Sequence, residues 1–267
     1  MVLKKNNDYT LYTLGARGSR PVHGKDFDIF GGQTTCFILK YRKHAVVIDC
    51  GTGLYEAKEV LKDCELIDVI FTHVHYDHIL GLLDCSVFPS NARINFMGTF
   101  KYWLQTETIS DFFRHPFWPV QPNVGVICEI CNDGTSYNLA DGFLLEVHKA
   151  SHPDFGNVII LHCGDKKISF MFDLEVEDGL NLEIIKNSDF LIFDGMFDES
   201  EYQAHKGWGH STYTEGCALA IRFNCNQLLV THHNPSRTDK ELIAFEARAK
   251  KVFGKTRFCR AGDIFTL

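Results

Sequence analysis

The chain has 267 residues, of which 45% are hydrophobic, 13% aromatic and 23% charged, and its formal net charge is −7. This length and apolar content suit an α/β core and exclude a disordered, collagen-like or coiled-coil chain. No apolar run reaches the roughly 18–20 residues that a membrane span requires. The N-terminal segment also lacks the apolar stretch of a secretory signal. We therefore expect a cytoplasmic protein without membrane contact, and the acidic balance weighs against bulk nucleic-acid binding.

Short apolar runs alternate with turn residues along the whole chain. In the first third, the pattern predicts strands at 9–14, 34–41, 45–50, 68–72 and 96–98, and helices at 54–62 and 77–83. In the second half, it predicts strands at 144–149, 157–163, 167–173, 190–194 and 227–231, and helices at 180–186, 213–222 and 239–250. Since strands and helices mix throughout and no linker separates them, we expect one α/β layered domain over residues 1–267.

Residues 99–137 depart from this pattern and are interpreted as an insertion within that domain. The large rings of this segment are Tyr102, Trp103, Phe112, Phe113, Phe117 and Trp118. They either form a cover that stacks a base or another flat group, or pack over the sheet, and the sequence leaves both open.

The chain is rich in histidine, with 13, and in cysteine, with 10. Most cysteines lie inside apolar segments, which favours reduced, buried thiols. Cys128 and Cys131 form a single C-x-x-C pair. Without a second pair at metal-site spacing, we interpret it as structural.

The histidines cluster in the segment 73–78, where His73, His75, Asp77 and His78 form H-x-H-x-D-H directly after a predicted strand. At a strand end, His73 and His75 point the same way because side chains alternate with period two. A helix that starts at Asp77 turns the chain back toward the same point. Three imidazoles and a carboxylate suit zinc or a similar first-row metal. The alternative is a charged surface turn with chance histidines, which so dense a pattern makes the weaker interpretation.

Three further candidates also lie at predicted strand ends. His152 follows the strand 144–149, Asp173 ends the strand 167–173, and His232 follows the strand 227–231. Each alone is more typical of an ordinary turn residue. Together with the first cluster, they favour a site at which the loops converge.

The order of these residues resembles the five motifs of the metallo-β-lactamase superfamily. Asp49 precedes the segment 73–78, and His152, Asp173 and His232 follow it in turn. The resemblance covers most of the chain, and the six-residue motif is highly specific. It implies a four-layer αββα sandwich with two mixed sheets inside, and a centre of two divalent metal ions at one edge.

The same resemblance implies which residues hold each metal ion. By position, His73, His75 and His152 would hold the first ion, and Asp173 would bridge the two. Zinc is the expected metal, although manganese and iron suit the same ligands.

Asp77, His78 and His232 would hold the second ion. His233 competes with His232 for this role, and His232 is preferred because it directly follows the strand. Asp49 would order the motif loop without touching metal, since carboxylates commonly fix ligand histidines.

A second segment narrows the expected chemistry. Asp194 ends a predicted strand, and the sequence Gly-His-Ser-Thr at 209–212, which includes His210, precedes a predicted helix. This resembles ribonuclease Z and its phosphodiesterase relatives, in which the histidine protonates the leaving oxygen and the carboxylate orients it. A departing alkoxide needs such a proton. The alternative, in which His210 and Ser211 only cap the helix, is compatible with this role.

We therefore expect a metal-dependent hydrolase and, within that class, a phosphodiesterase that acts on a nucleotide or another small phosphodiester. Attack would come from a hydroxide bound between the metals, with Asp77 also holding a proton of the attacking water. RNA is the less favoured substrate, because no basic insertion resembles the tRNA-gripping arm of ribonuclease Z and Asp194 stands where Glu is more usual. Asp173, in place of Cys, counts against β-lactam cleavage.

Two other functions stay open at this point. One is a lactonase or thioesterase that uses the same metals for carbonyl chemistry, against which Asp194 and His210 weigh. The other is a non-catalytic member of the fold, against which the complete set of ligand residues weighs. The sequence leaves the natural substrate and the choice between a monomer and a homodimer open.

Overall fold

The structure is a computed structural model, and it describes residues 9–98, 115–116, 118–119, 133–153, 156–177 and 179–267, together with the backbone of 127–130. Within these residues, no helix has the length and apolar character that crossing a membrane requires. The cysteine side chains that the structure describes are free, and all of them except Cys85 are buried.

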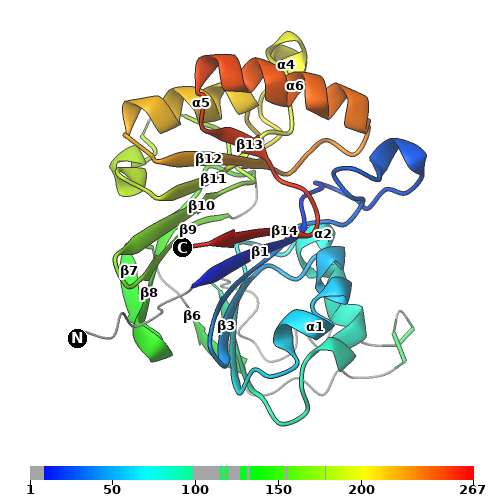
Figure 1. Cartoon of the computed structure of the whole chain (residues 1–267), viewed down its shortest axis with the longest axis vertical. Coiled ribbons are helices and arrows are strands. Elements are labelled where there is room, and N and C mark those ends of the chain that lie inside the picture. The colour runs from blue at the N-terminus through cyan, green and yellow to red at the C-terminus, as the bar shows by residue number, and fades with distance from the viewer. Residues whose placement is uncertain are drawn as a thin grey trace, which may run out of the picture.

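Two seven-stranded sheets form the centre of the molecule (Figure 1). The first sheet has the order β14 (Asp263–Thr266), β1 (Thr10–Gly15), β2 (Cys36–Tyr41), β3 (His44–Ile48), β4 (Leu66–Ile70), β5 (Arg93–Gly98) and β6 (Ile127–Ile130). Neighbours from β14 to β3 pair antiparallel, and neighbours from β3 to β6 pair parallel. All five residues of β3 are buried, as expected of a central strand covered on both faces.

The second sheet is mixed in the same way. Its order is β13 (Thr256–Phe258), β12 (Gln227–Thr231), β11 (Phe190–Asp194), β10 (Lys166–Met171), β9 (Asn157–Cys163), β8 (Phe143–Lys149) and β7 (Thr135–Asn138). Neighbours from β13 to β10 pair parallel, and those from β10 to β7 pair antiparallel. Strands β8, β10, β11 and β12 therefore run in one direction, and their carboxyl ends lie at the same edge.

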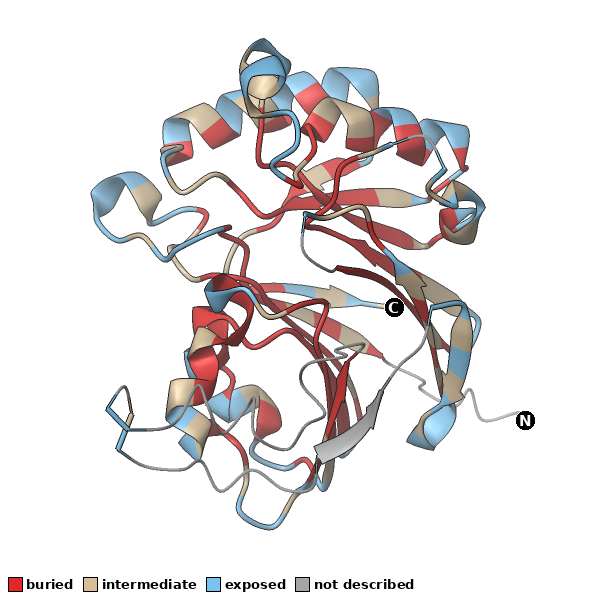
Figure 2. Cartoon of the chain, turned by 180° about the vertical axis from the view of Figure 1, so that it is seen from behind, coloured by how far each residue is buried: buried red, intermediate tan, exposed pale blue. Residues whose placement is uncertain are grey.

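Three apolar clusters account for the layers. One lies between the sheets, where side chains such as Leu39 and Ile48 of the first sheet meet Leu161 and Ile192 of the second. The other two clusters join the outer face of each sheet to its helices. Figure 2 shows buried residues lining both sheets and the inward faces of the helices. The predicted four-layer αββα sandwich is confirmed.

Each sheet has its own layer of helices on its outer face. On the first sheet they are η2 (Thr52–Glu56), α1 (Lys58–Leu61), α2 (Tyr76–Ile79) and η3 (Leu80–Val87). On the second sheet they are α5 (Tyr213–Arg222) and α6 (Asp239–Val252). The remaining elements are η1 (Lys25–Phe27), η4 (Ala140–Gly142), η5 (Leu182–Ile185) and α4 (Glu199–His205).

The predictions of regular α-helices at 54–62, 77–83 and 180–186 are wrong. The structure has only short α-helical turns or 3-10 helices in these three segments. In the helix predicted at 77–83, backbone groups form hydrogen bonds with residues outside the helix. The Gly81 N–H donates to the Cys50 carbonyl, and the Cys50 N–H donates to the His78 carbonyl. These bonds tie α2 to the loop after β3, so the regular ladder ends at Ile79. The third becomes the single turn η5, followed by Asn187 with a φ of 58°.

Most of the predicted aromatic insertion lies outside the described residues, as do the side chains of the C-x-x-C pair. Of the rings named for it, only Trp118 is described, and it packs at the edge of the first sheet's outer cluster. Because both sheets share one core, we propose that residues 1–267 form a single domain with the insertion at about 99–137.

Candidate metal centre

The sequence-predicted residues come together at one edge of the sandwich. Segment 73–78 follows β4 in the first sheet, and Asp49 follows β3. In the second sheet, His152 follows β8, Asp173 follows β10 and His232 follows β12. Since these strands end at a common edge, their loops converge, as expected for residues that serve one site.

The first group consists of His73, His75 and His152, which offer one ligand atom each, all within 4.8 Å of one another. His73 is buried, His152 is half-buried and His75 is exposed. Burial lowers the pKa of His152 to about 4 and that of His73 well below its usual value. Both imidazoles are therefore neutral at pH 7 and keep a lone pair for a metal.

The second group consists of Asp77, His78, Asp173 and His232, all of them buried. His232 Nε2 lies 3.1 Å from Asp77 Oδ2 and 3.1 Å from Asp173 Oδ1. The other oxygen of Asp173 lies 3.1 Å from His78 Nε2. Asp173 also lies 3.9 Å from His73 Nε2 in the first group, so its carboxylate stands between the two groups.

Asp49 lies beneath this centre and is fully buried. Its Oδ2 is 2.7 Å from His78 Nδ1 and accepts the Thr72 hydroxyl, while its Oδ1 accepts the Thr72 backbone N–H. These bonds fix the rotation of the His78 ring and direct its Nε2 toward the centre. This is the relation by which a carboxylate typically orients a ligand histidine.

Several buried side-chain nitrogen and oxygen atoms of these residues make no hydrogen bond of acceptable geometry within the described part of the chain, although imidazoles and carboxylates lie close together here. They are His73 Nε2, His78 Nε2, His152 Nδ1, Asp173 Oδ2 and His232 Nδ1. An unsatisfied buried polar atom costs roughly 1–3 kcal/mol, so such a concentration at one place indicates a missing partner. Imidazole nitrogen and carboxylate oxygen are ligands for zinc, manganese and iron. The residues present therefore fit divalent metal ions.

The backbone at this centre is strained in a way that supports a functional role. Asp49, Asp173 and His232 have positive φ angles of 58°, 56° and 56°. Left-handed backbone is uncommon outside glycine, and it persists at sites where the surroundings demand it. The conformation turns each of these side chains inward at the end of its strand.

His210 and Asp194 lie next to the second group. His210 Nδ1 is 2.9 Å from Asp194 Oδ2, and Asp194 also accepts the backbone N–H groups of Asp173 and Met196. Burial alone would lower the pKa of His210, but Asp194 and the other carboxylates of the site raise it to about 9. Thr212 caps helix α5 through its side chain, so the capping role belongs to Thr212 rather than to His210 or Ser211.

The structure separates His232 from His233. His232 lies among the carboxylates described above, whereas the His233 Nε2–H donates to the Cys259 carbonyl at 2.9 Å. The His233 ring also stacks on Phe258, away from both groups. Of the two, His232 is the one that lies beside Asp77 and Asp173.

Further residues hold the centre through their backbone or amide groups and were not predicted from the sequence. The Ser19 N–H donates to Asp77 Oδ2 at 2.7 Å, and the Asn157 amide donates to the Thr72 carbonyl at 2.7 Å. Gly18 approaches so closely that a Cβ there would lie 2.4 Å from the His232 ring. The turn sequence Gly-Ser-Arg-Pro at 18–21 was visible, but nothing local linked it to a site 58 residues away.

A cavity of about 400 Å³ opens beside the candidate metal centre at the edge of the sandwich. Its lining consists of Ser19, Val74, His75, Tyr76, Asp77, Asp173, His210 and His232. It offers access to both candidate metal groups and to the His210 ring.

Comparisons with known proteins agree with this arrangement. A family model described as a beta-lactamase superfamily domain matches residues 44–233. Ribonuclease Z of Clostridium kluyveri is 23% identical over 300 aligned positions, which cover 91% of this chain and 93% of that protein. Ribonuclease Z of Bradyrhizobium sp. (strain ORS 278) is 28% identical over 129 positions, which cover 48% of this chain and only 42% of that protein.

Among solved structures, the metallo-beta-lactamase fold protein YhfI from Bacillus subtilis superimposes with a TM-score of 0.76. The superposition covers 98% of this chain and 100% of that chain. At 16% sequence identity, this similarity shows the shared fold.

Proposed function

Because the chain belongs to the beta-lactamase superfamily, a family that indicates a metal-dependent hydrolase, we propose that it is a phosphodiesterase acting on a nucleotide or another small phosphodiester. The observation that carries the proposal is the hydrogen-bonded pair of His210 and Asp194 beside the metal-binding groups. The relatives named ribonuclease Z support cleavage of a phosphodiester bond.

The proposed metal ligands are the seven residues predicted from the sequence: His73, His75, Asp77, His78, His152, Asp173 and His232. Two divalent ions held there, with zinc the expected metal, would lower the pKa of a coordinated water and neutralise charge on the phosphate. Asp77, whose Oδ2 accepts the Ser19 N–H, would accept a proton from that water.

His210 supplies the proton that the leaving oxygen needs. Its Nδ1 is committed to Asp194, so its Nε2–H is the one free to donate, and the ring lines the cavity. Asp194 cannot rotate away, because two backbone N–H groups hold its oxygens. The pair therefore presents a proton donor in a fixed orientation, as general acid catalysis requires.

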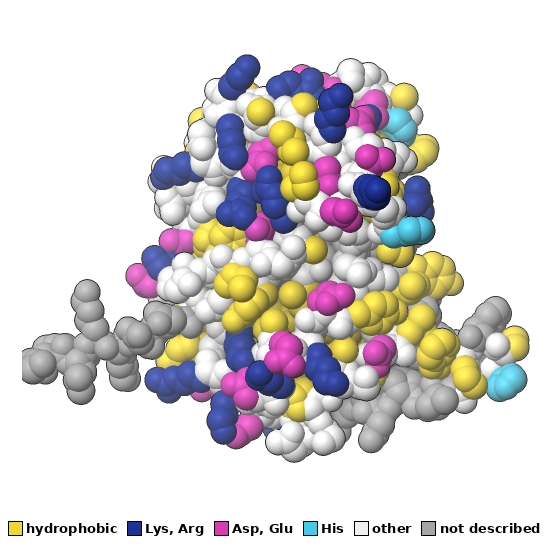
Figure 3. Space-filling model, turned by 45° about the vertical axis from the view of Figure 1, so that its right-hand side comes forward, with side chains coloured by type: hydrophobic (Ala, Val, Ile, Leu, Met, Phe, Trp, Pro, Cys, Tyr) yellow, Lys and Arg dark blue, Asp and Glu magenta, His cyan; other side chains and the backbone are white. Residues whose placement is uncertain are grey.

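The distribution of charge favours a small diester over a long RNA. Among the described residues on the face shown in Figure 3, Lys and Arg lie interspersed with Asp and Glu rather than forming one continuous basic stripe. The net charge of −7 points the same way. Proteins that grip an RNA backbone typically gather their basic residues on one face.

The direct test is a side-by-side assay of the metal-loaded protein on bis(p-nitrophenyl) phosphate, a lactone and a thioester. We expect diester turnover well above that of the two carbonyl substrates. Lactone or thioester turnover in excess of diester turnover would assign the site to acyl chemistry instead. Absence of turnover on all three, in metal-loaded protein, would overturn the proposal.

A further inference from the structure

The cavity of about 400 Å³ beside the candidate metal centre, which we call the metal-centre cavity, combines polar and apolar lining residues. Asp77, Asp173 and His232 of its lining belong to the second metal-binding group. The apolar part comes from Val74 and Tyr76, which alternate along the chain with the proposed metal ligands. Small-molecule sites typically combine a few polar groups with an apolar surface. A phosphate ester bound at the polar part therefore shares the cavity with this apolar surface.

Tyr76 presents a large ring at this cavity. It is 69% exposed, whereas Asp77 and His78, the next two residues of α2, are buried. Among the large hydrophobic residues in the described part of the chain, none is more exposed than Tyr76. Scattered exposed hydrophobic residues are normal on a protein surface, but this one lines the cavity that contains the proposed ligands. A molecule that enters the cavity can therefore cover the Tyr76 ring.

The backbone of Tyr76 is fixed relative to both metal-binding groups. Tyr76 lies between His75 of the first group and Asp77 of the second. Since consecutive Cα atoms are about 3.8 Å apart, the Tyr76 Cα lies that close to the Cα atoms of both. The Leu80 N–H donates to the Tyr76 carbonyl, and Asp77 Oδ2 accepts the Ser19 N–H at 2.7 Å. A surface held in this way before a ligand arrives lowers the entropic cost of binding.

We propose that Tyr76 determines specificity at this site by stacking its ring on a flat aromatic ring that the phosphate ester carries. This inference rests on the proposed phosphodiesterase function, because it requires a phosphate ester at the metal centre. An aromatic side chain stacks on any base, since every base has a π-face. The same chemistry serves a nucleobase and a small aryl group. The substrate class is therefore a phosphodiester with a flat ring on at least one of its ester groups.

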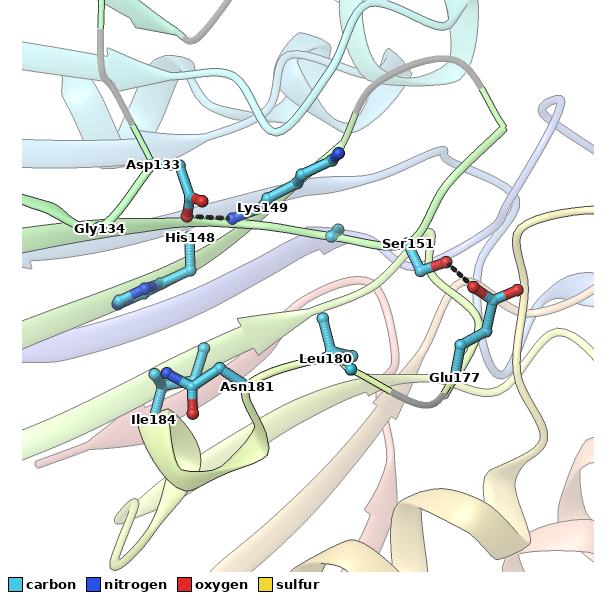
Figure 4. Close-up of a pocket in the computed structure, with 11 residues that line it drawn as sticks. Asp133, Gly134, His148, Lys149, Ser151, Glu177, Leu180, Asn181 and Ile184 are labelled. Carbon is cyan, nitrogen blue, oxygen red and sulfur yellow. Dashed lines mark hydrogen bonds between the residues drawn. The ribbon is translucent and has the colours of Figure 1, made fainter.

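A second cavity, of about 530 Å³, lies along the end of β8 and offers a control for where a ligand binds (Figure 4). The described lining residues of the two cavities have none in common. Figure 4 shows Asn181 and Ile184 on one side of β8 and the Lys149 side chain on the other. Asn181→Ala therefore changes the lining of this second cavity and leaves that of the metal-centre cavity as it is.

The test measures binding of four probes to the metal-loaded protein by calorimetry. AMP against ribose 5-phosphate reports a nucleobase, and phenyl phosphate against inorganic phosphate reports a small aryl group. We expect the ring to tighten binding about 10–100-fold in at least one of these pairs. Tyr76→Phe should keep this preference, because the ring remains. Tyr76→Leu keeps apolar bulk without a flat ring, so it should remove the preference and leave the binding of inorganic phosphate unchanged.

The matched control is Tyr55→Leu. Tyr55 is also exposed, and its hydroxyl donates to the Leu80 carbonyl after α2, but it does not line the metal-centre cavity. The inference is overturned if neither ring tightens binding, or if Tyr76→Leu weakens inorganic phosphate as much as the ring-bearing probes. It is also overturned if Tyr55→Leu or Asn181→Ala removes the preference as Tyr76→Leu does.

The outcomes separate this inference from the proposed function. Diester turnover without a preference for a ring refutes the role of Tyr76 alone. A preference that depends on Tyr76, without diester turnover, refutes the proposed function and keeps Tyr76 as a stacking residue. Absence of both phosphate binding and diester turnover in metal-loaded protein refutes both.

Discussion

His78 Nδ1 lies 2.7 Å from Asp49 Oδ2, and both side chains are fully removed from solvent. The bond commits one nitrogen of the ring to the carboxylate and leaves the other facing Asp77 and Asp173. The loop after β3 thereby sets the orientation of a proposed metal ligand that lies after β4.

Asp49→Asn tests this relationship with little change in shape. The amide keeps a hydrogen-bonding group near His78 but loses the negative charge that favours the metal-binding tautomer. We expect metal affinity to fall about 10–100-fold, as when such carboxylates are replaced in other metal sites. Titration of metal-depleted protein with zinc measures the change.

A matched control is Asp68→Asn, which alters a second buried carboxylate and histidine pair. Asp68 Oδ2 lies 2.9 Å from His44 Nε2, but this pair is remote from the proposed ligands along β3 and β4. The Asp68→Asn substitution should lower the free energy of unfolding without lowering metal affinity. Equal affinities for the Asp49→Asn variant and the unmodified protein would refute the orienting role.

His210→Ala tests the proposed proton donor through the leaving group. A nitrophenolate departs with little help, whereas the alkoxide from a dinucleoside monophosphate needs a proton. We expect turnover of the dinucleoside monophosphate to fall by about 10²–10⁴, with a smaller loss on bis(p-nitrophenyl) phosphate and unchanged metal content. Steady-state kinetics on both substrates measure the contrast.

His205→Ala is the control for this experiment. His205 lies nearby on α4, but it stacks on Phe197 and its Nδ1 pairs with the Glu201 carbonyl. Its removal should leave the ratio of the two activities unchanged. An identical loss on both substrates for His210→Ala would argue for a structural role of His210 instead.

Arg17→Met tests the anchor of the segment that carries Gly18 and Ser19. Arg17 is fully buried, and burial lowers its pKa to about 10, so it remains charged at pH 7. It donates to the carbonyls of Gly31 and Arg237 and lies 3.7 Å from Asp239. Removing one partner of a buried charge pair costs about 3–5 kcal/mol of the free energy of unfolding.

Denaturant unfolding measures this loss, and Arg20→Met, at an exposed position in the same segment, is the comparison. Surface changes of this kind usually stay within about 0.5 kcal/mol. If Arg17→Met costs no more than Arg20→Met, Arg17 is not the anchor of this segment.

Patterns within single elements predicted much of the fold. Helix α5 and strand β12 have the predicted bounds, because the first has a Thr212 capping box and the second is a buried apolar run. Short strands such as β13 and β14 were missed, since three or four residues carry too little periodicity. Helix α4 was missed because it is polar and buries none of its residues.

The site likewise contains residues that the sequence predicted and residues that it did not. His73, His75 and His78 were predicted as neighbours because their spacing is local, and the resemblance to a known family connected them to His152 and His232. The structure brings these five residues together, and their role as metal ligands stays a prediction. Ser19 and Asn157 were not found, because their contacts join residues 58 and 85 positions apart and depend on how the loops pack. Their donor groups, a backbone N–H and a buried amide, leave no mark on local sequence patterns.

The central claim is a centre of two metal ions held by the residues around Asp173. Metal analysis of protein purified without added chelator or metal tests it most directly, with circular dichroism to verify folding. We predict about two equivalents of divalent metal per chain, because two ligand groups lie side by side and the Asp173 carboxylate stands 3.9 Å from His73 Nε2 of the first group and 3.1 Å from His78 Nε2 of the second. Folded protein that retains less than one equivalent, and gains none on dialysis against zinc, manganese or iron, would contradict the account.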